Sequence, residues 1–390
     1  LKWNVQRSSS KIAFFFILLF FQVSCMSSVQ ENENQLEKST IGYSLSDFGA
    51  VSIDEPRAGL VGRDILLAGG NAIDAAVASY FAMSVTKPSA ASLGGGGICL
   101  VRDSNSGEVE TLDFRPKLAN GNNNSLGIPV AIPANAFGFF ALHAKFGKLK
   151  WSKLVQPAEN LARFGSNVSR SFAHDLNMAS PILKTNQKIW EIFSGPRTRK
   201  VLQEGEYLKQ TELSTVLSLI RSKGAGSLYK GPMARQFVTA INASGANLTY
   251  EDMRDFRPSW KETIRIPFVH DTNIHFPAGT GATGITLAQV MSMVTYDQLY
   301  MESDQVERVH LIAETLERAL SDRTRWSNLD QYERSVEYIV SREHVANLME
   351  SYDPQYRVVT PDAISAPLDP SSQSSSTSFA IVDASGSVVS

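Results

Sequence analysis

The stretch AGGNAIDAAVASYFAMSV, residues 68–85, decides the fold of this chain. From residue 60 onward, apolar and alanine side chains recur with the three- and four-residue spacing of a helix. Gly69 and Gly70 interrupt that spacing, and Asn71 is a residue type that caps helix N-termini. The stretch therefore predicts two helices joined at a glycine elbow. The short alanine side chains predict that the second helix packs closely against a sheet.

Strand patterns flank this helical stretch. GAVSI, residues 49–53, predicts a short strand before it. After it, residues 92–103 and 109–116 predict a β-hairpin around the turn SNSGE. The four glycines at 94–97 allow the backbone to pass close to another strand or to a ligand.

The rest of the chain shows less clear patterns of apolar and polar residues. Residues 135–269 predict mainly helix, residues 306–320 predict a further amphipathic helix, and the final residues return to a strand pattern. Strands at both ends with helices between them predict one α+β domain whose sheet is assembled from distant segments.

Composition narrows the class of protein. The 390 residues are 43% hydrophobic and 19% charged, which is typical of a globular protein with a core. A net charge of -2 with interspersed signs predicts no nucleic-acid partner. The six histidines are scattered without zinc-like spacing, so no metal is expected. Cys99 lies in an apolar stretch and is expected to be a buried structural thiol.

The N-terminus resembles an export signal. Three basic residues precede an unbroken apolar run at residues 12–21, too short to span a bilayer but typical of a signal peptide. We expect residues 1–25 to be this signal and residues 26–47 to be a polar tether. Cys25 is a candidate lipid-attachment site. The expected location is the periplasm or the cell exterior, with Cys25 as the point of membrane attachment.

Two motifs have more than one interpretation. Residues 279–284, GTGATG, form a GxGxxG pattern before a helix, which occurs in dinucleotide-binding turns. Pro277 interrupts the preceding strand and no βαβ unit surrounds the pattern, so we favour a closely packed helix start and expect no cofactor. Arg115, at the end of a hairpin strand, is either a solvated charge or a fork for a carboxylate. The local pattern leaves both open.

The terminal segment SSSTSFAIVD, residues 374–383, also has two interpretations. It is either a serine-rich linker before a strand, or a scissile bond before an N-terminal nucleophile. A Ser or Thr at a new N-terminus carries its own α-amine, which acts as general base, so no separate histidine is required. The absence of a G-x-S-x-G motif is consistent with the second interpretation.

Taken together, these segments resemble the γ-glutamyltranspeptidase family of N-terminal nucleophile hydrolases. The matching segments follow the family's order from residue 48 to residue 390. They are GAVSIDEPRAGLVGRDILLAGGNAIDAAVA, SLGGGGICLVRD, LDFRP, VAIPANAFGFFALHAKFGKLKWSKLVQPAENLARFG, LTYEDMRDFRPSWKE, VHLIAETLERALSDR and TSFAIVDASGSVVS. The resemblance implies an α+β fold, the αββα four-layer sandwich, incomplete at the C-terminus.

The resemblance also implies a function. Family members are precursors that cut themselves into two subunits, and the new N-terminal hydroxyl attacks γ-glutamyl amides such as glutathione. Aligning the strand after the cut predicts cleavage between Ser375 and Ser376, with Ser376 as nucleophile and Thr377 as the alternative. Residues 48–375 would be the large subunit, and residues 376–390 the start of a truncated small subunit, its partner after cleavage.

The resemblance assigns Arg115 to the substrate α-carboxylate, and it names water, an amino acid or a peptide as acceptor. Four positions depart from the family pattern: Ser376 replaces Thr, Ser378 replaces a frequent His, Pro116 replaces a frequent Glu, and Ala134 after Pro133 replaces a usual Gly. These departures leave two alternatives, a related acylase acting on another amide and an inactive envelope protein with this fold.

Overall fold

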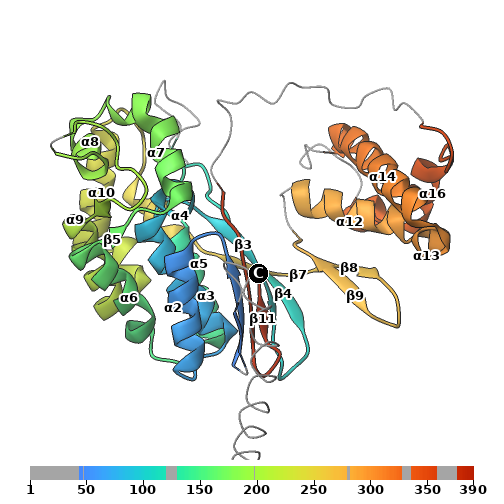
Figure 1. The fold of residues 1–390 in the computed structure, drawn as a ribbon, viewed down its shortest axis with the longest axis horizontal. Helices are drawn as coiled ribbons and strands as arrows, with labels where there is room; N and C mark the ends of the chain where they lie inside the picture. The colour runs from blue at the N-terminus through green and yellow to red at the C-terminus, as the bar shows by residue number, and fades with distance from the viewer. Residues whose placement is uncertain are drawn as a thin grey trace, which may run out of the picture. The chain divides into compact units, whose positions relative to one another are not determined.

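A seven-stranded sheet assembled from distant parts of the chain is the central feature of the computed structural model (Figure 1). The strand order is β1–β2–β10–β11–β3–β4–β7, and the neighbours from β2 to β7 pair antiparallel. The strands are β1 Ser44–Ser46, β2 Gly49–Ile53, β3 Gly97–Arg102, β4 Val109–Phe114, β7 Ser259–Glu262, β10 Phe379–Asp383 and β11 Val388–Val389. The last strands of the sequence therefore lie between β2 and β3, which confirms the prediction of a sheet built from both ends.

The structure describes residues 44–46, 48–119, 130–196, 198–278, 282–326, 335–357 and 376–390. The predicted signal peptide with Cys25, most of the predicted tether, Gly279, Gly281 and Ser375 lie outside these residues. Within the described ranges, no helix combines the length and the apolar character that crossing a membrane requires.

The core helix is α3, Ala72–Thr86, and it begins as residues 68–85 predict. Asn71 and Asp74 form a capping box, in which each side chain accepts the other residue's backbone N–H, at 2.9 and 3.2 Å. The preceding helix, α2 Pro56–Leu67, is followed by Gly69 with φ +84°, a left-handed conformation that favours glycine. The two helices around a glycine elbow are confirmed.

Small side chains let the neighbours of α3 approach it closely. Every residue of α3 is buried, and α3 packs against α2, β10, β11 and the helices α5, Asn135–Phe146, and α6, Trp151–Phe164. A Cβ added at Gly62 of α2 would lie 2.4 Å from the Ser79 hydroxyl of α3. The predicted close packing of α3 on the sheet is confirmed, and this contact extends it to α2.

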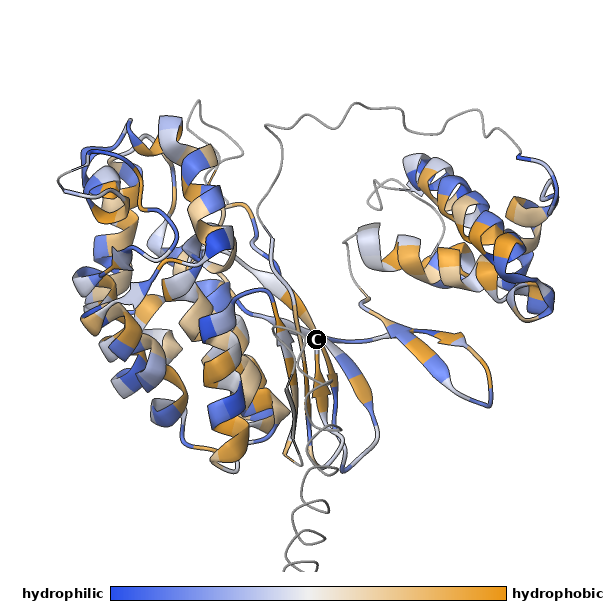
Figure 2. Cartoon of the chain, in the orientation of Figure 1, coloured by the Kyte–Doolittle hydropathy of each residue, from blue (hydrophilic) through white to orange (hydrophobic). Residues whose placement is uncertain are grey.

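Smaller helices and strands complete this part of the chain. They are α4 Pro88–Ala91, α7 Arg170–Leu183, α8 Gln187–Phe193, α9 Thr211–Lys223, α10 Pro232–Asn242, α11 Tyr250–Asp255, the 3-10 helix Ala225–Leu228, and the paired strands β5 Ser166–Asn167 and β6 Tyr207–Leu208. In Figure 2, the hydropathy colours of the ribbon alternate between apolar and polar residues along the helices.

A second helix-on-sheet unit follows β7. Its hairpin consists of β8, Ile264–Pro267, and β9, Asn273–Phe276. Its helices are α12 Ala282–Val294, α13 Leu299–Glu302, α14 Gln305–Trp326, α15 Val336–Ile339 and α16 Arg342–Met349, with a 3-10 turn at Tyr296–Gln298. Apolar side chains from β8, α12, α14 and α15 share one core, in which Trp326 is fully buried.

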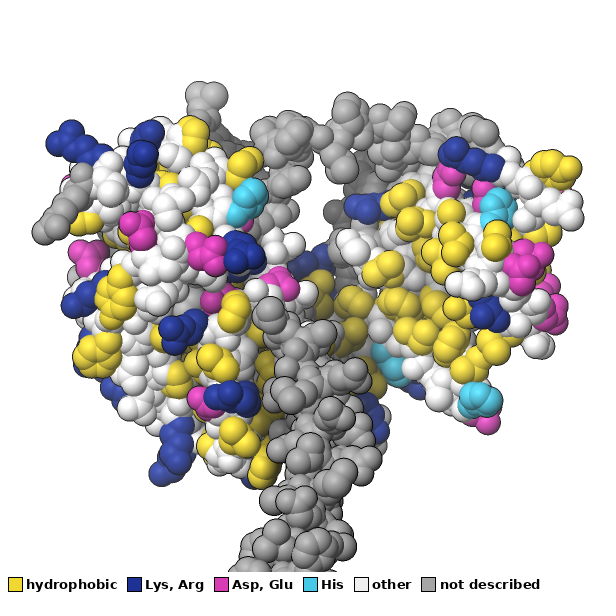
Figure 3. All heavy atoms as spheres, in the orientation of Figure 1, with side chains coloured by type: hydrophobic (Ala, Val, Ile, Leu, Met, Phe, Trp, Pro, Cys, Tyr) yellow, Lys and Arg dark blue, Asp and Glu magenta, His cyan; other side chains and the backbone are white. Residues whose placement is uncertain are grey.

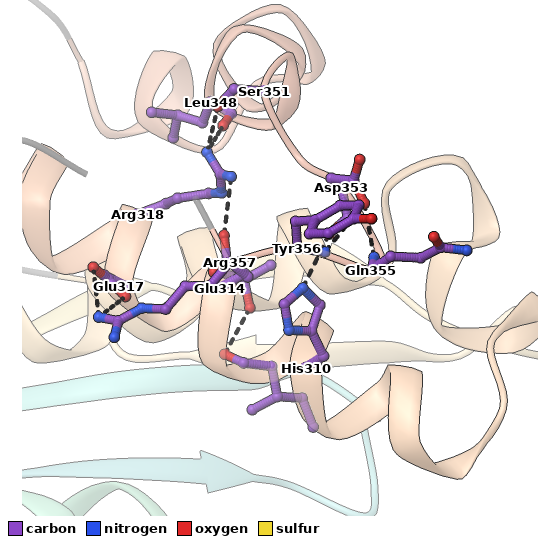
Figure 4. Close-up of polar contacts among 12 residues, drawn as sticks. His310, Glu314, Glu317, Arg318, Leu348, Ser351, Asp353, Gln355, Tyr356 and Arg357 are labelled. Atoms are coloured by element: carbon purple, nitrogen blue, oxygen red, sulfur yellow. Dashed lines mark hydrogen bonds and ion pairs between the residues drawn. The ribbon is translucent and has the colours of Figure 1, made fainter. Parts of the chain in front are cut away.

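Polar contacts bind the segment after α16 to α14 (Figure 4). Arg318 of α14 donates to the Leu348 carbonyl at 3.0 Å and to the Ser351 hydroxyl at 2.9 Å. Farther along, Arg357 forms an ion pair with Glu317 at 3.1 Å. These contacts fix the described chain up to residue 357.

The prediction of mainly helix for residues 135–269 is wrong near its end. Strands β7 and β8 occupy residues 259–262 and 264–267. The reason is tertiary, because β7 completes the edge of the large sheet beside β4. The α+β class itself is confirmed by the described elements.

Candidate active site

Thr377 lies just before β10, beside the end of β2. Its hydroxyl donates to Asp54 Oδ2 at 2.8 Å, and the backbone N–H of Ser378 approaches the same oxygen at 3.4 Å. Thr377 Oγ1 also lies 3.8 Å from the sulfur of Met83 on α3. Sequence reasoning missed Asp54, although an acid that directly follows a strand is a visible signal. Its carboxylate fixes the start of β10 against β2.

Ser376 and Thr377 belong to opposite faces of the sheet. In β10, Ile381 lies in the α3 core, and Asp383 accepts the N–H of Ala72 at the start of α3 at 2.9 Å. Thr377 shares this face, as its contact with α3 shows. Successive residues of an extended strand point to opposite faces, and continuing the alternation of β10 back from Phe379 assigns Ser376 to the face away from α3. Ser376 is exposed, whereas Thr377 is half-buried.

Arg115 directly follows β4, and its guanidinium is bound by the carboxylate of Asp113. Its Nε and Nη2 donate to the two oxygens of Asp113, at 3.0 and 2.8 Å. Lys261 of β7 donates to Asp113 Oδ2 at 2.9 Å. Burial would raise the pKa of Asp113, but the hydrogen bonds from Arg115 and Lys261 outweigh it and hold that pKa well below its usual range. The carboxylate therefore stays ionised and keeps the guanidinium oriented.

Sequence reasoning named Arg115 but missed Asp113 and Lys261. Asp113 stands two residues before Arg115, and period-two alternation puts both on one face of a strand. Lys261 had no comparable signal, because it reaches Asp113 through the pairing of β7 with β4.

The register places Arg115 and Ser376 at the same end of the sheet, the end at which β4 finishes and β10 begins. One row of paired residues crosses it: Val51, Ile381, Val389, Val101, Glu110 and Glu262. Ser376 lies five residues before Ile381, and Arg115 lies five residues after Glu110. Because β10 and β4 run in opposite directions, five residues back along β10 and five residues forward along β4 lead to the same end of the sheet.

Both residues also belong to the same face of the sheet. Leu112 and Phe114 of β4 pack in the α3 core, so Asp113 and Arg115 face away from it. This is the face assigned to Ser376. Three inter-strand spacings, about 14 Å, separate β10 from β4. The arrangement sets a hydroxyl and a guanidinium fork across a gap that an extended small molecule can bridge.

The glycines at residues 94–97, which lead into β3, allow close packing of the backbone. A Cβ at Gly96 would lie 2.5 Å from both the Phe114 carbonyl oxygen and Pro116 Cδ. Of the two predicted alternatives for glycines 94–97, Gly96 fits the close approach of another chain segment. Pro116, the departure from the family pattern, packs over this glycine. Gly284 likewise lacks room for a side chain, because a Cβ there would lie 2.5 Å from the Pro277 carbonyl, as expected for a closely packed helix start.

A cavity of about 540 Å³ opens beside Arg115. Its lining residues are Asp113, Arg115, Pro116, Lys117, Phe256, Arg257, Ser259 and Lys261. Four of these side chains are cationic and one is anionic, so the cavity suits an anionic group.

Cys99, the remaining residue considered for chemistry, has a structural role. Cys99 is buried, and burial raises the pKa of its thiol to about 12, so it is inert as predicted. In the part of the chain that the structure describes, no cluster of His, Cys, Asp and Glu has the make-up of a metal site.

The fold defines a class, the α+β proteins with helices packed on a central antiparallel sheet that the last strands of the chain help to build. The profile of the family described as Gamma-glutamyltranspeptidase matches residues 58–390. The chain therefore belongs to the γ-glutamyltranspeptidase family, as the sequence motifs predict.

Individual relatives agree with this membership. A glutathione hydrolase proenzyme of Pseudomonas aeruginosa is 30% identical, and the match covers 88% of this chain and 63% of the relative. An Acylase ACY 1 proenzyme of a Pseudomonas species is 29% identical over 70% of this chain and 53% of the relative. The chain thus spans somewhat more than half the length of these relatives.

A solved structure extends the likeness to the fold. The crystal structure of Helicobacter pylori γ-glutamyltranspeptidase superposes with a TM-score of 0.72 at 25% identity. The superposition covers 84% of this chain and 96% of the other. The predicted fold class, that of the N-terminal nucleophile hydrolases, is confirmed.

Proposed function

We propose that this chain belongs to a self-cleaving γ-glutamyltransferase precursor that hydrolyses or transfers the γ-glutamyl group of glutathione and related compounds. The observation that carries the proposal is that the strand register assigns Ser376 and Arg115 to the same end and the same face of the sheet. A γ-glutamyl group has a carboxylate for the guanidinium at one end and a reactive carbonyl at the other.

The first step is cleavage. The hydroxyl of Ser376 attacks the carbonyl carbon of Ser375, the peptide bond breaks, and the resulting ester is hydrolysed by water. This leaves a carboxylate on Ser375 and a free α-amine on Ser376. The amine is then the general base that catalysis requires.

Catalysis repeats the same chemistry on the substrate. The α-amine takes the proton of the Ser376 hydroxyl as its oxygen attacks the γ-carbonyl carbon. The C–N bond breaks, and the ammonium returns that proton to the leaving amine. Water, an amino acid or a peptide then attacks the ester, passes its proton to the amine, and restores the hydroxyl.

Ser376 is the preferred nucleophile because its face of the sheet carries Arg115. Thr377 is the alternative, and its hydroxyl is engaged with Asp54 on the other face. We therefore expect Ser376→Ala to abolish cleavage and Thr377→Ala to retain it. Mass spectrometry of the purified protein after incubation reports the cut, and the new N-terminal residue identifies its position.

The outcomes separate the alternatives. A cut that persists in Ser376→Ala and disappears in Thr377→Ala would assign Thr377. A protein that stays uncut and releases no glutamate from γ-glutamyl-p-nitroanilide would support the inactive envelope protein. Release of the dye from glutaryl-p-nitroanilide but not from the γ-glutamyl compound would support the acylase, which the acylase relative also favours.

We further propose that the protein is exported and anchored through Cys25, and that its role lies in glutathione metabolism outside the cytoplasm. The basic residues and apolar run before Cys25 support export. Metabolic labelling with a fatty acid would test the anchor, with Cys25→Ser as the control.

A further inference from the structure

Asp54 holds the chain just after the predicted cleavage site. Backbone pairing between β2 and β10 ends at Ile53 and Phe379. Asp54 directly follows that last pair, and its Oδ2 accepts the Thr377 hydroxyl at 2.8 Å. The N–H of Ser378 approaches the same oxygen at 3.4 Å. The side chain of Asp54 therefore continues the hydrogen bonding of the sheet for two residues beyond its last backbone pair.

Thr377 is also held from a second side, by α3. Its Oγ1 lies 3.8 Å from the sulfur of Met83, which is 1% exposed and belongs to the α3 core. A side chain packed in a core leaves its neighbour little room to move. Thr377 is thus confined between the end of β2 and α3, and its branched Cβ restricts its own rotation further.

Ser376 is the residue directly before this anchored pair. A trans peptide keeps consecutive Cα atoms about 3.8 Å apart, so the anchor at Thr377 limits where the backbone of Ser376 can lie. The proposed nucleophile is therefore connected to the sheet through a residue that one carboxylate holds in place.

We propose that Asp54 positions the cleavage site, by holding the two residues that follow Ser376 while the Ser376 hydroxyl attacks. The inference rests on the proposed function for the reaction itself. In that step, Oγ of Ser376 bonds to the carbonyl carbon of Ser375, the C–N bond between the two residues breaks, and the hydroxyl proton goes to the freed nitrogen. Asp54 acts through Thr377 and Ser378, so it is a positioning residue.

The physical reason is the dependence of an intramolecular attack on geometry. Such a reaction is fast when the two groups are held close to the reactive arrangement, and a small misplacement costs a large factor in rate. Without the carboxylate, the segment before β10 would lose both contacts to Asp54 and would reach that arrangement less often.

Two substitutions of Asp54 test the proposal. Asp54→Ala should slow the cut about 10- to 100-fold, because it removes both contacts at once. Asp54→Asn should recover most of the rate, since its amide oxygen remains an acceptor at a similar position. Cell-free translation of the full chain followed by gel electrophoresis measures the rates, because the uncut chain is then present at the start.

Thr377→Val probes the same hydrogen bond from its other end. It removes the hydroxyl but keeps the branched side chain, and it should also slow the cut. If both residues act through one contact, Asp54→Ala combined with Thr377→Val should be no slower than the slower single variant, whereas independent effects would multiply. Complete loss of the cut in Thr377→Val would make Thr377 the nucleophile and overturn the positioning role.

Val51→Ala separates positioning from stability. Val51 is a buried residue of β2, and its truncation removes core contacts but no side-chain hydrogen bond. It should lower the melting temperature and leave the rate of the cut almost unchanged. Asp64→Ala, at an exposed ion pair with Arg63 on α2, should change neither quantity.

Equal rates for Asp54→Ala and the unsubstituted chain would overturn the positioning role. A slow cut that Asp54→Asn does not recover would do the same, and so would a Val51→Ala protein that is slowed as much as Asp54→Ala. Failure of the proposed function gives a different result, because the unsubstituted chain itself then stays uncut, and this inference fails with it.

Discussion

Arg115 donates two hydrogen bonds from its guanidinium to the carboxylate of Asp113, so the planar group is already oriented. A guanidinium ordered in this way loses little further side-chain entropy when a ligand binds. Lysine can supply the charge at this position but not the fork. The residue type and its orientation both follow from the contact with Asp113.

We predict that Arg115→Lys raises the KM for γ-glutamyl-p-nitroanilide about 10- to 100-fold, because a bidentate charge-assisted contact contributes about 1.5–3 kcal/mol. The kcat should change little, since the contact is made equally in the ground and transition states. Steady-state kinetics measure both constants. Arg63→Lys, at an exposed ion pair with Asp64, is the control. An unchanged KM would remove Arg115 from the site.

How far the sequence predicts this site depends on how far apart its parts lie. The local patterns left two interpretations open for Arg115 and for the serine-rich segment, and the family resemblance then assigned Arg115, Ser376 and the alternative Thr377. Asp54 and Lys261 were not found, because their roles depend on which strands pair. The pairing of β10 with β2 places Asp54 beside Thr377, and the pairing of β7 with β4 places Lys261 beside Asp113. No local sequence pattern encodes which strands pair.

At the scale of elements, buried polar groups join helices that the sequence predicts only singly. Asp74 lies in the first turn of α3, and its carboxylate also accepts the backbone N–H groups of Lys148 and Leu149, at 3.0 and 2.9 Å. It therefore caps its own helix and fixes the connection between α5 and α6. The N-cap at Asn71 was predicted from the sequence, but neither role of Asp74 was.

Buried polar contacts also hold together the helices after β9, and we call the contacts of Asp322 with Gln289 and His344 the junction. Asp322 of α14 accepts from Gln289 of α12 at 2.7 Å and contacts Nε2 of His344 in α16 at 2.8 Å. Burial would raise the pKa of Asp322, and the hydrogen bonds from His344 and Gln289 outweigh it, so the pKa lies below its ordinary value. The ionised form is thus the one that stabilises the fold.

The sign of this shift predicts an acid-sensitive junction. A lowered folded-state pKa stabilises the protein above the unfolded pKa of about 3.9, and that contribution is lost as pH falls through the folded value. We expect Asp322→Asn to lower the free energy of unfolding by about 1–3 kcal/mol at pH 7 and to flatten its decline below about pH 4. Urea denaturation followed by tryptophan fluorescence measures both.

Asp297→Asn is the matched control for this junction, since Asp297 pairs with Arg342 in the same helical unit but is exposed. It should leave the acid dependence almost unchanged. If Asp322→Asn kept the full decline of stability in acid, the junction would not be its source.

At the scale of the whole molecule, the sheet explains why some elements were predicted and others were not. Helices such as α3 and α14 carry their periodicity in consecutive residues, so the sequence alone located them. The short strands β7 and β8 follow a helical region and have only four residues each. β7 pairs with β4, and β8 pairs with β9 and packs against α12.

The orientation of α14 is the feature of the whole fold that hydrophobic periodicity predicts least well. Its buried side carries the apolar residues Leu311, Ala319 and Trp326. The same side also carries Glu314, Arg318 and Asp322, which bond to each other or to α12 and α16. Its apolar stripe is exposed: Val306 77%, Val309 66%, Ile312 45% and Leu316 42%. Figure 3 shows hydrophobic side chains gathered on the surface of this helical unit.

An exposed apolar stripe of this length binds hydrophobic probes, because contiguous apolar surface is rare on soluble domains. We predict that the folded chain enhances the fluorescence of 8-anilinonaphthalene-1-sulfonate. The triple variant Val309→Gln, Ile312→Gln, Leu316→Gln should reduce this enhancement by about half or more, since it removes the central part of the stripe. Dye titration at constant protein concentration measures the change.

Leu60→Gln tests whether the position matters or only the loss of an apolar side chain. Leu60 is 44% exposed on α2, comparable to Leu316, but the stripe on α14 does not include it. Its substitution should leave dye binding almost unchanged, and circular dichroism should show full helix content in both variants. Equal losses in the two proteins would mean that the dye reports general surface hydrophobicity. In that case the exposed apolar stripe of α14 would have no measurable consequence.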